Sequence, residues 1–369
     1  MGHKKRTLTR WGVPFAYRAV ICYHQAMTTG CVYHPIYLKH DTGQHVEVAA
    51  RLEAVIAYLE KTGLKSRLTL IEPRPATVDE IALVHQRGYI KEIEETAAKG
   101  GGWLDPDTVM SPDSYQAALY AAGGVIRAVE AVMAGEVSNA FALVRPPGHH
   151  ATADQAMGFC LFNNIAIATE YALKEYKLER ILIIDFDVHH GNGTQGTFYD
   201  NPRVMYISTH EYPFYPGTGR IDEVGSGEGR GTNLNIPLPA GCGDAEYLNV
   251  FEQIIVPAAR RFKPQLILVS VGYDGHWADP LAMMQLSVEG YARMTGIIKG
   301  LADELCEGRL ALTLEGGYNL EALAASVKAT FDILMGNDGE ELSGAPPRRS
   351  EAPDIESLIA EIKRIHGLG

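Results

Sequence analysis

Helix-like and strand-like patterns of apolar residues alternate along most of this chain. Some stretches repeat apolar residues with the spacing of one helix face, and short apolar runs lie between them. The predicted helices span residues 48–61, 114–134, 163–176, 246–262, 287–305 and 320–335. The predicted strands span residues 140–144, 181–184, 204–207, 266–271 and 310–314. Because these strands are apolar on both faces, we predict an α/β fold with a mostly parallel central sheet and helices on both sides.

The two ends of the chain differ in composition from this alternating region. Residues 1–26 contain Lys and Arg but no acidic residue, and Arg18 interrupts their apolar part, which argues against a signal peptide. We expect a basic extension that is disordered or artefactual, with Met27 as an alternative start. Residues 337–353 are rich in Gly, Pro and charge and are predicted to be a linker before a C-terminal helix within 354–369. We expect a single folded domain, residues 27–336, between them.

The composition is that of an ordinary globular protein, with 46% hydrophobic and 21% charged residues in a chain of 369. The formal net charge of -12 argues against a nucleic-acid partner and suits a cationic substrate. No run of 18 apolar residues occurs, so no membrane partner is expected. The five cysteines are scattered and form no C-x-x-C pair, which indicates a reducing, cytoplasmic location. The oligomeric state stays open.

Polar clusters follow all five predicted strands. In an open α/β sheet, ligands collect at the carboxyl ends of the strands, so clusters after parallel neighbours are expected to converge on one site. The clusters are RPPGHH at 145–150, DFDVHHGN at 185–192, STH at 208–210, GYD at 272–274 and EGGY at 315–318.

One half of a metal site is visible in the second cluster. Side chains two residues apart on an extended chain point the same way, so Asp187 and His189 can face one ion. Asp274 from another strand end would complete an Asp2His set that leaves a fourth position open, as catalytic zinc sites require. Two oxygen donors make Fe²⁺ compatible as well. A single D-x-H pattern is otherwise common in surface turns, but its place after a buried strand favours the metal site.

Groups suited to proton transfer accompany this half-site. The adjacent His149 and His150 can serve as base and acid, provided that a partner fixes the tautomer of each ring. Asp185 and Asn192 are the candidate partners, and they make the two rings electrostatically unequal. Tyr318, after two glycines, can donate a hydrogen bond to a substrate carbonyl. Each of these residues has an alternative role in packing if the clusters do not meet.

Taken together, the motifs resemble those of the histone deacetylase superfamily, and most closely its class II and bacterial members. The resemblance covers residues 28 to 335. It rests on RPPGHHA at 145–151, GFC at 158–160, DFDVHHGNGTQ at 185–195, YPGTG at 215–219, GYD at 272–274 with DP at 279–280, and LEGGYN at 314–319.

The resemblance implies an arginase-like/deacetylase three-layer sandwich and assigns roles to the residues found above. Three of them would bind Zn²⁺, namely Asp187, His189 and Asp274. His149 and His150 would be the tandem histidines, backed by Asp185 and Asn192, and Tyr318 the carbonyl polariser. An asparagine at 192 points to class II, since class I members have aspartate there. A structural K⁺ is expected in an inner site; the residues that match it are Asp185, Asp187, His189, Ser208 and Thr209.

The resemblance also implies a substrate tunnel and an amide-hydrolysis reaction. Phe159 and Tyr215 match the two aromatic walls of the family's acyl-lysine tunnel, and Gly158 is expected to bind substrate beside them. Leu281 stands where polyamine-selective relatives carry a glutamate, which favours acetyl-lysine in proteins or peptides as the substrate. Acetylated polyamines and other small acetylamines are the alternative. A protein that binds acylated ligands without hydrolysing them is disfavoured, because the full set of ligands and proton-transfer residues is present.

Overall fold

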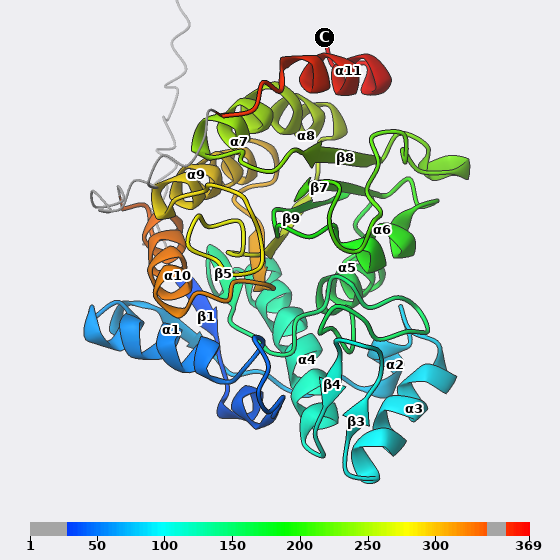
Figure 1. Cartoon of the computed structure of the whole chain (residues 1–369), viewed down its shortest axis with the longest axis vertical. Helices are drawn as coiled ribbons and strands as arrows, with labels where there is room; N and C mark the ends of the chain where they lie inside the picture. Colours follow the sequence, from blue (N-terminus) through cyan, green and yellow to red (C-terminus); the bar gives the residue numbers. More distant parts are fainter. Residues whose placement is uncertain (1–27, 338–351) are drawn as a thin grey trace, which may run out of the picture.

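A parallel sheet of eight strands forms the centre of the molecule (Figure 1). The computed structural model describes residues 28–337 and 352–369, so the predicted extension 1–26 and nearly all of the predicted linker lie outside the described residues. Every strand pairing in this sheet is parallel. In sheet order the strands are β2 (Thr69–Ile71), β1 (Thr29–Val32), β5 (Asn139–Ala142), β10 (Leu310–Leu314), β9 (Leu266–Val271), β6 (Ile181–Asp185), β7 (Val204–Glu211) and β8 (Asn233–Leu238).

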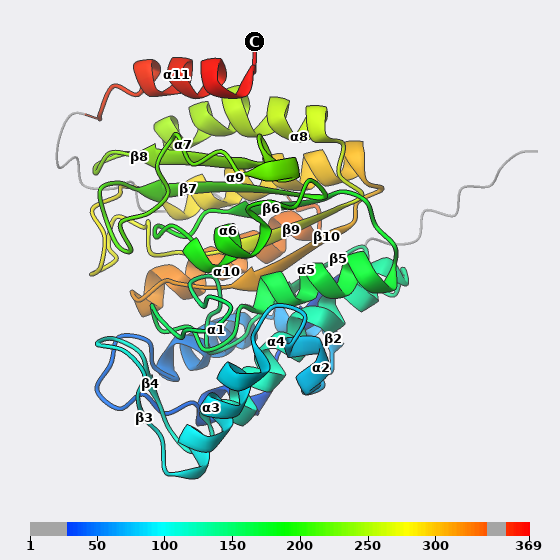
Figure 2. The same ribbon diagram turned by 90° about the vertical axis from the view of Figure 1, so that its right-hand side faces the viewer.

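Helices cover both faces of this sheet, which completes the three layers expected from the sequence (Figure 2). Because parallel strands are joined by right-handed crossovers, the direction of each crossover along the sheet decides which face its helix covers. One face carries α1 (Ala50–Lys61), α7 (Asp244–Val250), α8 (Val256–Phe262), α9 (Val288–Leu305) and α10 (Leu320–Leu334). The other carries α4 (Ser114–Met133), α5 (Asn164–Glu175) and α6 (Asn192–Phe198), with α2 (Val78–Ile81) and α3 (Arg87–Ala98) outside them.

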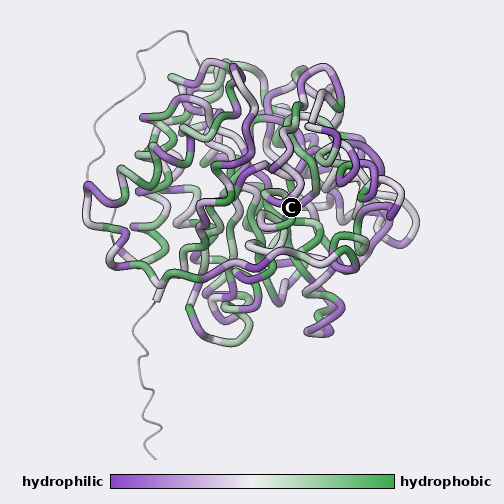
Figure 3. Tube along the Cα trace, turned by 90° about the horizontal axis from the view of Figure 1, so that it is seen from below, coloured by the Kyte–Doolittle hydropathy of each residue, from purple (hydrophilic) through white to green (hydrophobic). Residues whose placement is uncertain are grey.

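The core lies between these layers. All residues of β6, β9 and β10 are buried, as their almost uninterrupted apolar runs predict. The tube in Figure 3 shows hydrophobic stretches through the middle of the molecule and hydrophilic ones on many outer turns. Within the described ranges, 28–337 and 352–369, no helix has the length and apolar character needed to cross a membrane.

Most predicted elements agree with the structure to within two residues at each end, but two need correction. The helix predicted at 246–262 is divided by one π-helical turn, η4 (Phe251–Ile255), between α7 and α8. The strand predicted at 204–207 continues to Glu211, because β8 pairs alongside it through Glu211 and Leu238. The elements absent from the prediction are β1, β2, β8, α2, α3, α6 and the hairpin of β3 (Gly102–Trp103) and β4 (Val109–Met110).

The predicted C-terminal helix is α11 (Glu356–His366), and it packs on the layer that contains α8. Its apolar face, including Ile359 and Ile362, joins the common core. Lys363 Nζ donates to Gln253 Oε1 over 2.7 Å at the edge of this contact. The C-terminal helix is therefore packed on the domain that contains the sheet.

Candidate active site

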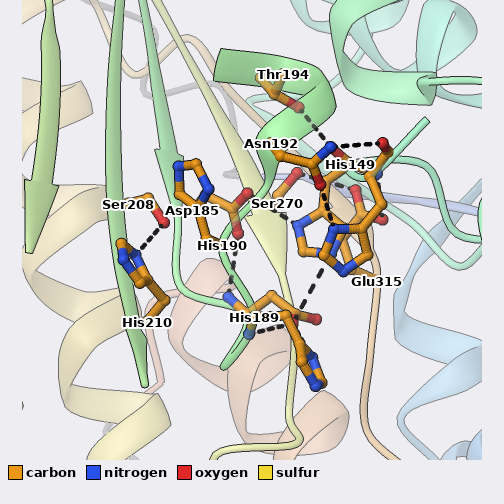
Figure 4. A network of polar contacts seen from close by, with 12 residues as sticks. His149, Asp185, His189, His190, Asn192, Thr194, Ser208, His210, Ser270 and Glu315 are labelled. Carbon is orange, nitrogen blue, oxygen red and sulfur yellow. Dashed lines mark hydrogen bonds and ion pairs between the residues drawn. The ribbon is translucent and has the colours of Figure 1, made fainter. Parts of the chain in front are cut away.

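The carboxyl ends of five adjacent strands bring the predicted polar clusters together. Figure 4 shows labelled residues of the clusters at the ends of β5, β6, β7 and β10. β5, β10, β9, β6 and β7 follow one another in the sheet, and each predicted cluster lies at the end of one of them. Ser208, Thr209 and His210 were expected in a loop but are the last residues of β7 before Glu211, and all three are buried. The convergence expected from the sequence is therefore observed.

Asp187, His189 and Asp274 form a compact group of metal-type ligands. One ligand atom from each lies within 4.8 Å of the others. His189 Nδ1 is 3.0 Å from Asp187 Oδ1 and 3.3 Å from Asp274 Oδ2. All three side chains are buried in the loops after β6 and β9. These distances allow a single cation to contact all three residues.

The surroundings of this group fit a bound cation. Asp274 Oδ2 is buried and accepts no hydrogen bond from the part of the chain that the structure describes. Two fully buried carboxylates repel each other unless a positive charge lies between them. The backbone approaches closely as well: a Cβ on Gly316 would lie 2.0 Å from Asp274 Oδ2, and one on Gly272 would lie 2.1 Å from Asp187 Oδ2. Two carboxylates and an imidazole are ligands that Zn²⁺ accepts.

His149 is paired with a buried carboxylate. Its Nδ1 lies 3.0 Å from Asp185 Oδ2, which also accepts a hydrogen bond from the Tyr206 hydroxyl at 2.9 Å. Burial alone would lower the pKa of His149, but the neighbouring Asp185 and Asp187 carboxylates raise it to about 10. The ring therefore favours the protonated form and contributes positive charge to the site.

His150 has a neutral hydrogen-bond partner, and its pKa is lowered rather than raised. Its Nδ1 lies 2.8 Å from Asn192 Oδ1, while Asn192 Nδ2 donates to the His150 carbonyl oxygen. Because the amide oxygen only accepts, the His150 proton is on Nδ1 and Nε2 carries a free lone pair. Burial, together with the positive charges of His149 and His189, holds the pKa of His150 well below its usual range. His150 is thus a neutral base beside a more cationic ring, 4.1 Å away between centroids.

Glu315 lies beneath the histidine pair and holds its backbone. Its carboxylate accepts hydrogen bonds from Gly148 N at 2.7 Å, His149 N at 3.2 Å and the Ser270 hydroxyl at 2.9 Å. Burial raises the pKa of Glu315 to about 7, against the lowering effect of His149. These bonds tie the loop after β5 to the ends of β9 and β10.

Tyr318 lies over a buried ionic network. Its ring faces the Arg51 guanidinium at 4.9 Å, and Arg51 Nε donates to the Gly317 carbonyl oxygen at 2.7 Å. Arg51 also forms an ion pair with Glu47 at 3.0 Å. The Arg145 guanidinium donates hydrogen bonds to both carboxylate oxygens of Glu47. Burial raises the pKa of Tyr318 well above its usual range, so the phenol stays protonated and can donate a hydrogen bond.

A cavity of about 220 Å³ is lined by four of the side chains described above, those of His149, His150, His189 and Tyr318. The four residues predicted for the substrate tunnel all contribute to it: Gly158, Phe159, Tyr215 and Leu281. The Phe159 ring meets that of Tyr318 edge-on at 5.8 Å, and the Tyr215 ring meets that of His150 edge-on at 5.1 Å. A Cβ on Gly158 would lie 2.3 Å from His150 Cδ2, so only glycine lets the wall approach the His150 ring this closely. The cavity is therefore narrow and aromatic.

The residues predicted for a K⁺ site are neighbours in the structure. Ser208 and Asp185 are register partners on β7 and β6. Thr209 Oγ1 is buried and without a hydrogen-bond partner among the described residues. A K⁺ ion there stays a prediction.

Several residues at this site were not identified from the sequence. Arg51 and Glu47 face the Tyr318 loop, and Phe214 stacks on His189 at 5.3 Å between ring centroids. One available signal was the position of Arg51, which falls on the same helix face as the buried Val55. A charged residue on an apolar helix face needs a buried partner, which here is Glu47.

Comparison with known proteins agrees with this site. A family model described as the histone deacetylase domain matches residues 45–334. A histone deacetylase-like amidohydrolase of Pseudomonas aeruginosa is 42% identical over 293 residues, which cover 79% of this chain and 77% of that protein. A probable deacetylase of Archaeoglobus fulgidus is 40% identical over 355 residues, which cover 92% of this chain and 98% of that protein.

A solved structure gives the same result for the fold. The crystal structure of the HDA15 HD domain matches with a TM-score of 0.84 and 35% sequence identity. The match covers 92% of this chain and 94% of the other. With the family model spanning most of the chain, the fold and the site lead to one conclusion: this chain belongs to the histone deacetylase family.

Proposed function

We propose that this chain is a zinc-dependent amidohydrolase that removes acetyl groups from the ε-amine of lysine in proteins or peptides. One observation carries the proposal: the Asp187, His189 and Asp274 group lies beside His150, next to a narrow aromatic cavity. A narrow cavity suits a single alkyl chain that presents its amide to the metal ligands. The family membership supports deacylation as the reaction.

Zn²⁺ is the metal we propose for the Asp2His group, with Fe²⁺ as the alternative that its oxygen-rich donor set also accepts. When bound, the cation supplies Lewis acidity toward a water molecule and the acyl oxygen. The buried Asp274 Oδ2 and the glycines around it leave room for an ion but not for a side chain.

His150 is the proposed general base and then the general acid. Its Nδ1 proton is held by Asn192, so Nε2 accepts the proton of the attacking water and later delivers it to the leaving amine. His149, held protonated by Asp185, adds positive charge next to the developing negative charge. The unequal partners of the two histidines therefore divide their roles.

Tyr318 is the proposed donor to the oxyanion. Its phenol remains protonated, and its ring is held between Phe159 and the Arg51 guanidinium. A pre-positioned donor of this kind acts on the tetrahedral state rather than on the ground state.

We also propose that the inner cluster around Asp185 and Ser208 holds K⁺. A further proposal is that the protein works in a reducing, cytoplasmic environment, because Cys31, Cys160, Cys242 and Cys306 are unpaired and buried.

The preference for acyl-lysine over acetylated polyamines rests on the cavity rim. Leu281, an uncharged residue, lines the cavity, and a second amine of a polyamine gains nothing from it. Asp107 also lines the cavity and is the feature that favours the alternative, because a carboxylate attracts a cationic substrate.

A paired hydrolysis assay tests the proposal. An acetyl-lysine peptide and N-acetylated putrescine and spermidine are supplied separately, each with and without a chelator. We expect chelator-sensitive hydrolysis with a higher kcat/KM for the peptide. A higher kcat/KM for the polyamines would move the assignment to that substrate class, and hydrolysis of neither by the metal-loaded protein would refute deacetylation.

A further inference from the structure

Asp279 is a buried carboxylate between two parts of the cavity wall. Only 7% of its surface is exposed, and it lies in the loop between β9 and α9. It follows Asp274 by five residues and precedes Leu281 by two. The reaction proposed above gives it no role.

One oxygen of Asp279 holds the Tyr318 backbone. Oδ2 accepts hydrogen bonds from Tyr318 N at 2.7 Å and Asn319 N at 3.2 Å. These N–H groups lie at the start of α10, where a carboxylate is favoured by the helix dipole. The two residues before Tyr318 are glycines, and Gly317 has a φ of 114°. Arg51 holds this segment through the Gly317 carbonyl oxygen, whereas Asp279 holds the backbone N–H of Tyr318 itself.

The other oxygen holds the rim of the cavity. Oδ1 accepts a hydrogen bond from Leu281 N at 3.0 Å. Two residues further on, Met283 N donates to the buried carboxylate of Glu211 at 3.0 Å. Asp279 is therefore bonded both to the rim segment and to the Tyr318 backbone, whereas the bond from Glu211 reaches only the rim segment.

We propose that Asp279 is a positioning residue that fixes the Tyr318 phenol relative to the substrate carbonyl and links that position to the cavity rim at Leu281. The inference rests on the proposed function and adds a determinant of turnover to it. A carboxylate is needed because three N–H donors converge on two acceptor oxygens, whereas an amide offers a single acceptor oxygen.

This chemistry predicts different effects for two substitutions. In Asp279→Asn the side chain has one acceptor oxygen, which accepts two hydrogen bonds if it faces the Tyr318 and Asn319 N–H groups but only one if it faces Leu281. We therefore expect the oxygen to face Tyr318 and Asn319 and the NH2 group to face the Leu281 N–H. We expect a raised KM with kcat close to that of the wild type. In Asp279→Ala all three hydrogen bonds are lost, and we expect kcat to fall about 10-fold or more, the usual effect of removing a supporting partner in an active site.

A double-mutant cycle with Tyr318→Phe separates positioning from a general structural role. If Asp279 acts through the Tyr318 hydroxyl, adding Asp279→Ala to Tyr318→Phe causes little further loss of kcat. The double variant should then turn over like Tyr318→Phe alone. If the two losses multiply, the inference is wrong. Should Asp279→Ala not fold, Asp279→Ser, which is too short to reach α10, replaces it in the same cycle.

Control variants separate a failure of this inference from a failure of the proposed function. Glu211→Gln alters a buried carboxylate at the end of β7 that holds the same rim segment through Met283 N and makes no bond to the Tyr318 backbone, so its effect should multiply with that of Tyr318→Phe. Zinc content and melting temperature are measured for every variant, and equal zinc content excludes damage to the metal ligands. If Tyr318→Phe alone turns over like the wild type, the proposed function is at fault. If Tyr318→Phe is impaired but the Asp279 effect is independent of it, only this inference fails.

Discussion

The Gly316→Ala substitution tests whether Asp187 and Asp274 bind the same metal ion. Gly316 lies between the two aspartates, and its amide donates to Asp187 Oδ2 at 2.8 Å. Unlike Gly317, it is not in the left-handed region of backbone space, so alanine can adopt its conformation. The effect of the substitution is therefore steric and local.

The size of the effect follows from the distances. The added methyl carbon would lie 2.0 Å from Asp274 Oδ2 and 2.5 Å from Asp187 Oδ2. Non-bonded heavy atoms need about 3.5 Å, so the separation from Asp274 Oδ2 must grow by about 1.5 Å and that from Asp187 Oδ2 by about 1 Å. Metal ligands tolerate displacements of about 0.2 Å. We therefore expect zinc affinity to fall about 100-fold or more, since even partners that only orient metal ligands contribute about 10- to 100-fold.

The assay is zinc titration of the metal-free protein, with bound metal and melting temperature measured together. Gly300→Ala is the matched control, because Gly300 lies on α9 and its Cβ would meet no atom within 4 Å. That substitution should leave zinc affinity unchanged and stabilise the protein by up to about 1 kcal/mol. Wild-type zinc affinity in Gly316→Ala would refute the assignment of Asp187 and Asp274 as joint ligands.

Three further predictions concern the surroundings of the site. Glu47→Gln leaves Arg145 without its buried carboxylate and should lower the free energy of unfolding by about 3–5 kcal/mol in urea titrations. Asn192→Asp places a carboxylate beside His150 Nδ1, so the acidic limb of the kcat/KM profile should move about 1 pH unit or more upward. Burial lowers the pKa of His85 from 6.5 to about 4, so its neutral form stabilises the fold above pH 6.5 and about 3 kcal/mol is lost on acidification toward pH 4. A His85→Gln variant should lack this part of the pH dependence of unfolding.

The elements predicted correctly are those whose pattern is set by burial on both sides. β9 and β10 are almost continuous apolar runs, interrupted only by Ser270 and Thr313, and their observed bounds are the predicted ones. β8 was missed because its first residues include Asn233 and Asn235, polar side chains that usually mark loops. Both donate to Gln195 Oε1 on α6, a partner nearly 40 residues away, and only the folded chain shows that pairing.

The site was predictable where short motifs follow strands, and less so elsewhere. Asp187, His189 and Asp274 meet as expected, because strand order brings the ends of β6 and β9 together. The roles of Arg51 and Asp279 depend on contacts with Gly317 and Tyr318, which lie far from them in sequence. No local pattern specifies such pairs, so these contacts became visible only in three dimensions.

The central claim is that the Asp2His group binds the metal on which deacetylation depends. The most direct test measures hydrolysis of an acetyl-lysine peptide by metal-free protein and again after one equivalent of Zn²⁺, alongside the metal content of Asp274→Ala. The account predicts no turnover without metal, recovery at one equivalent, and neither bound zinc nor recovery in Asp274→Ala. Hydrolysis by the metal-free protein, or full recovery in Asp274→Ala, would contradict it.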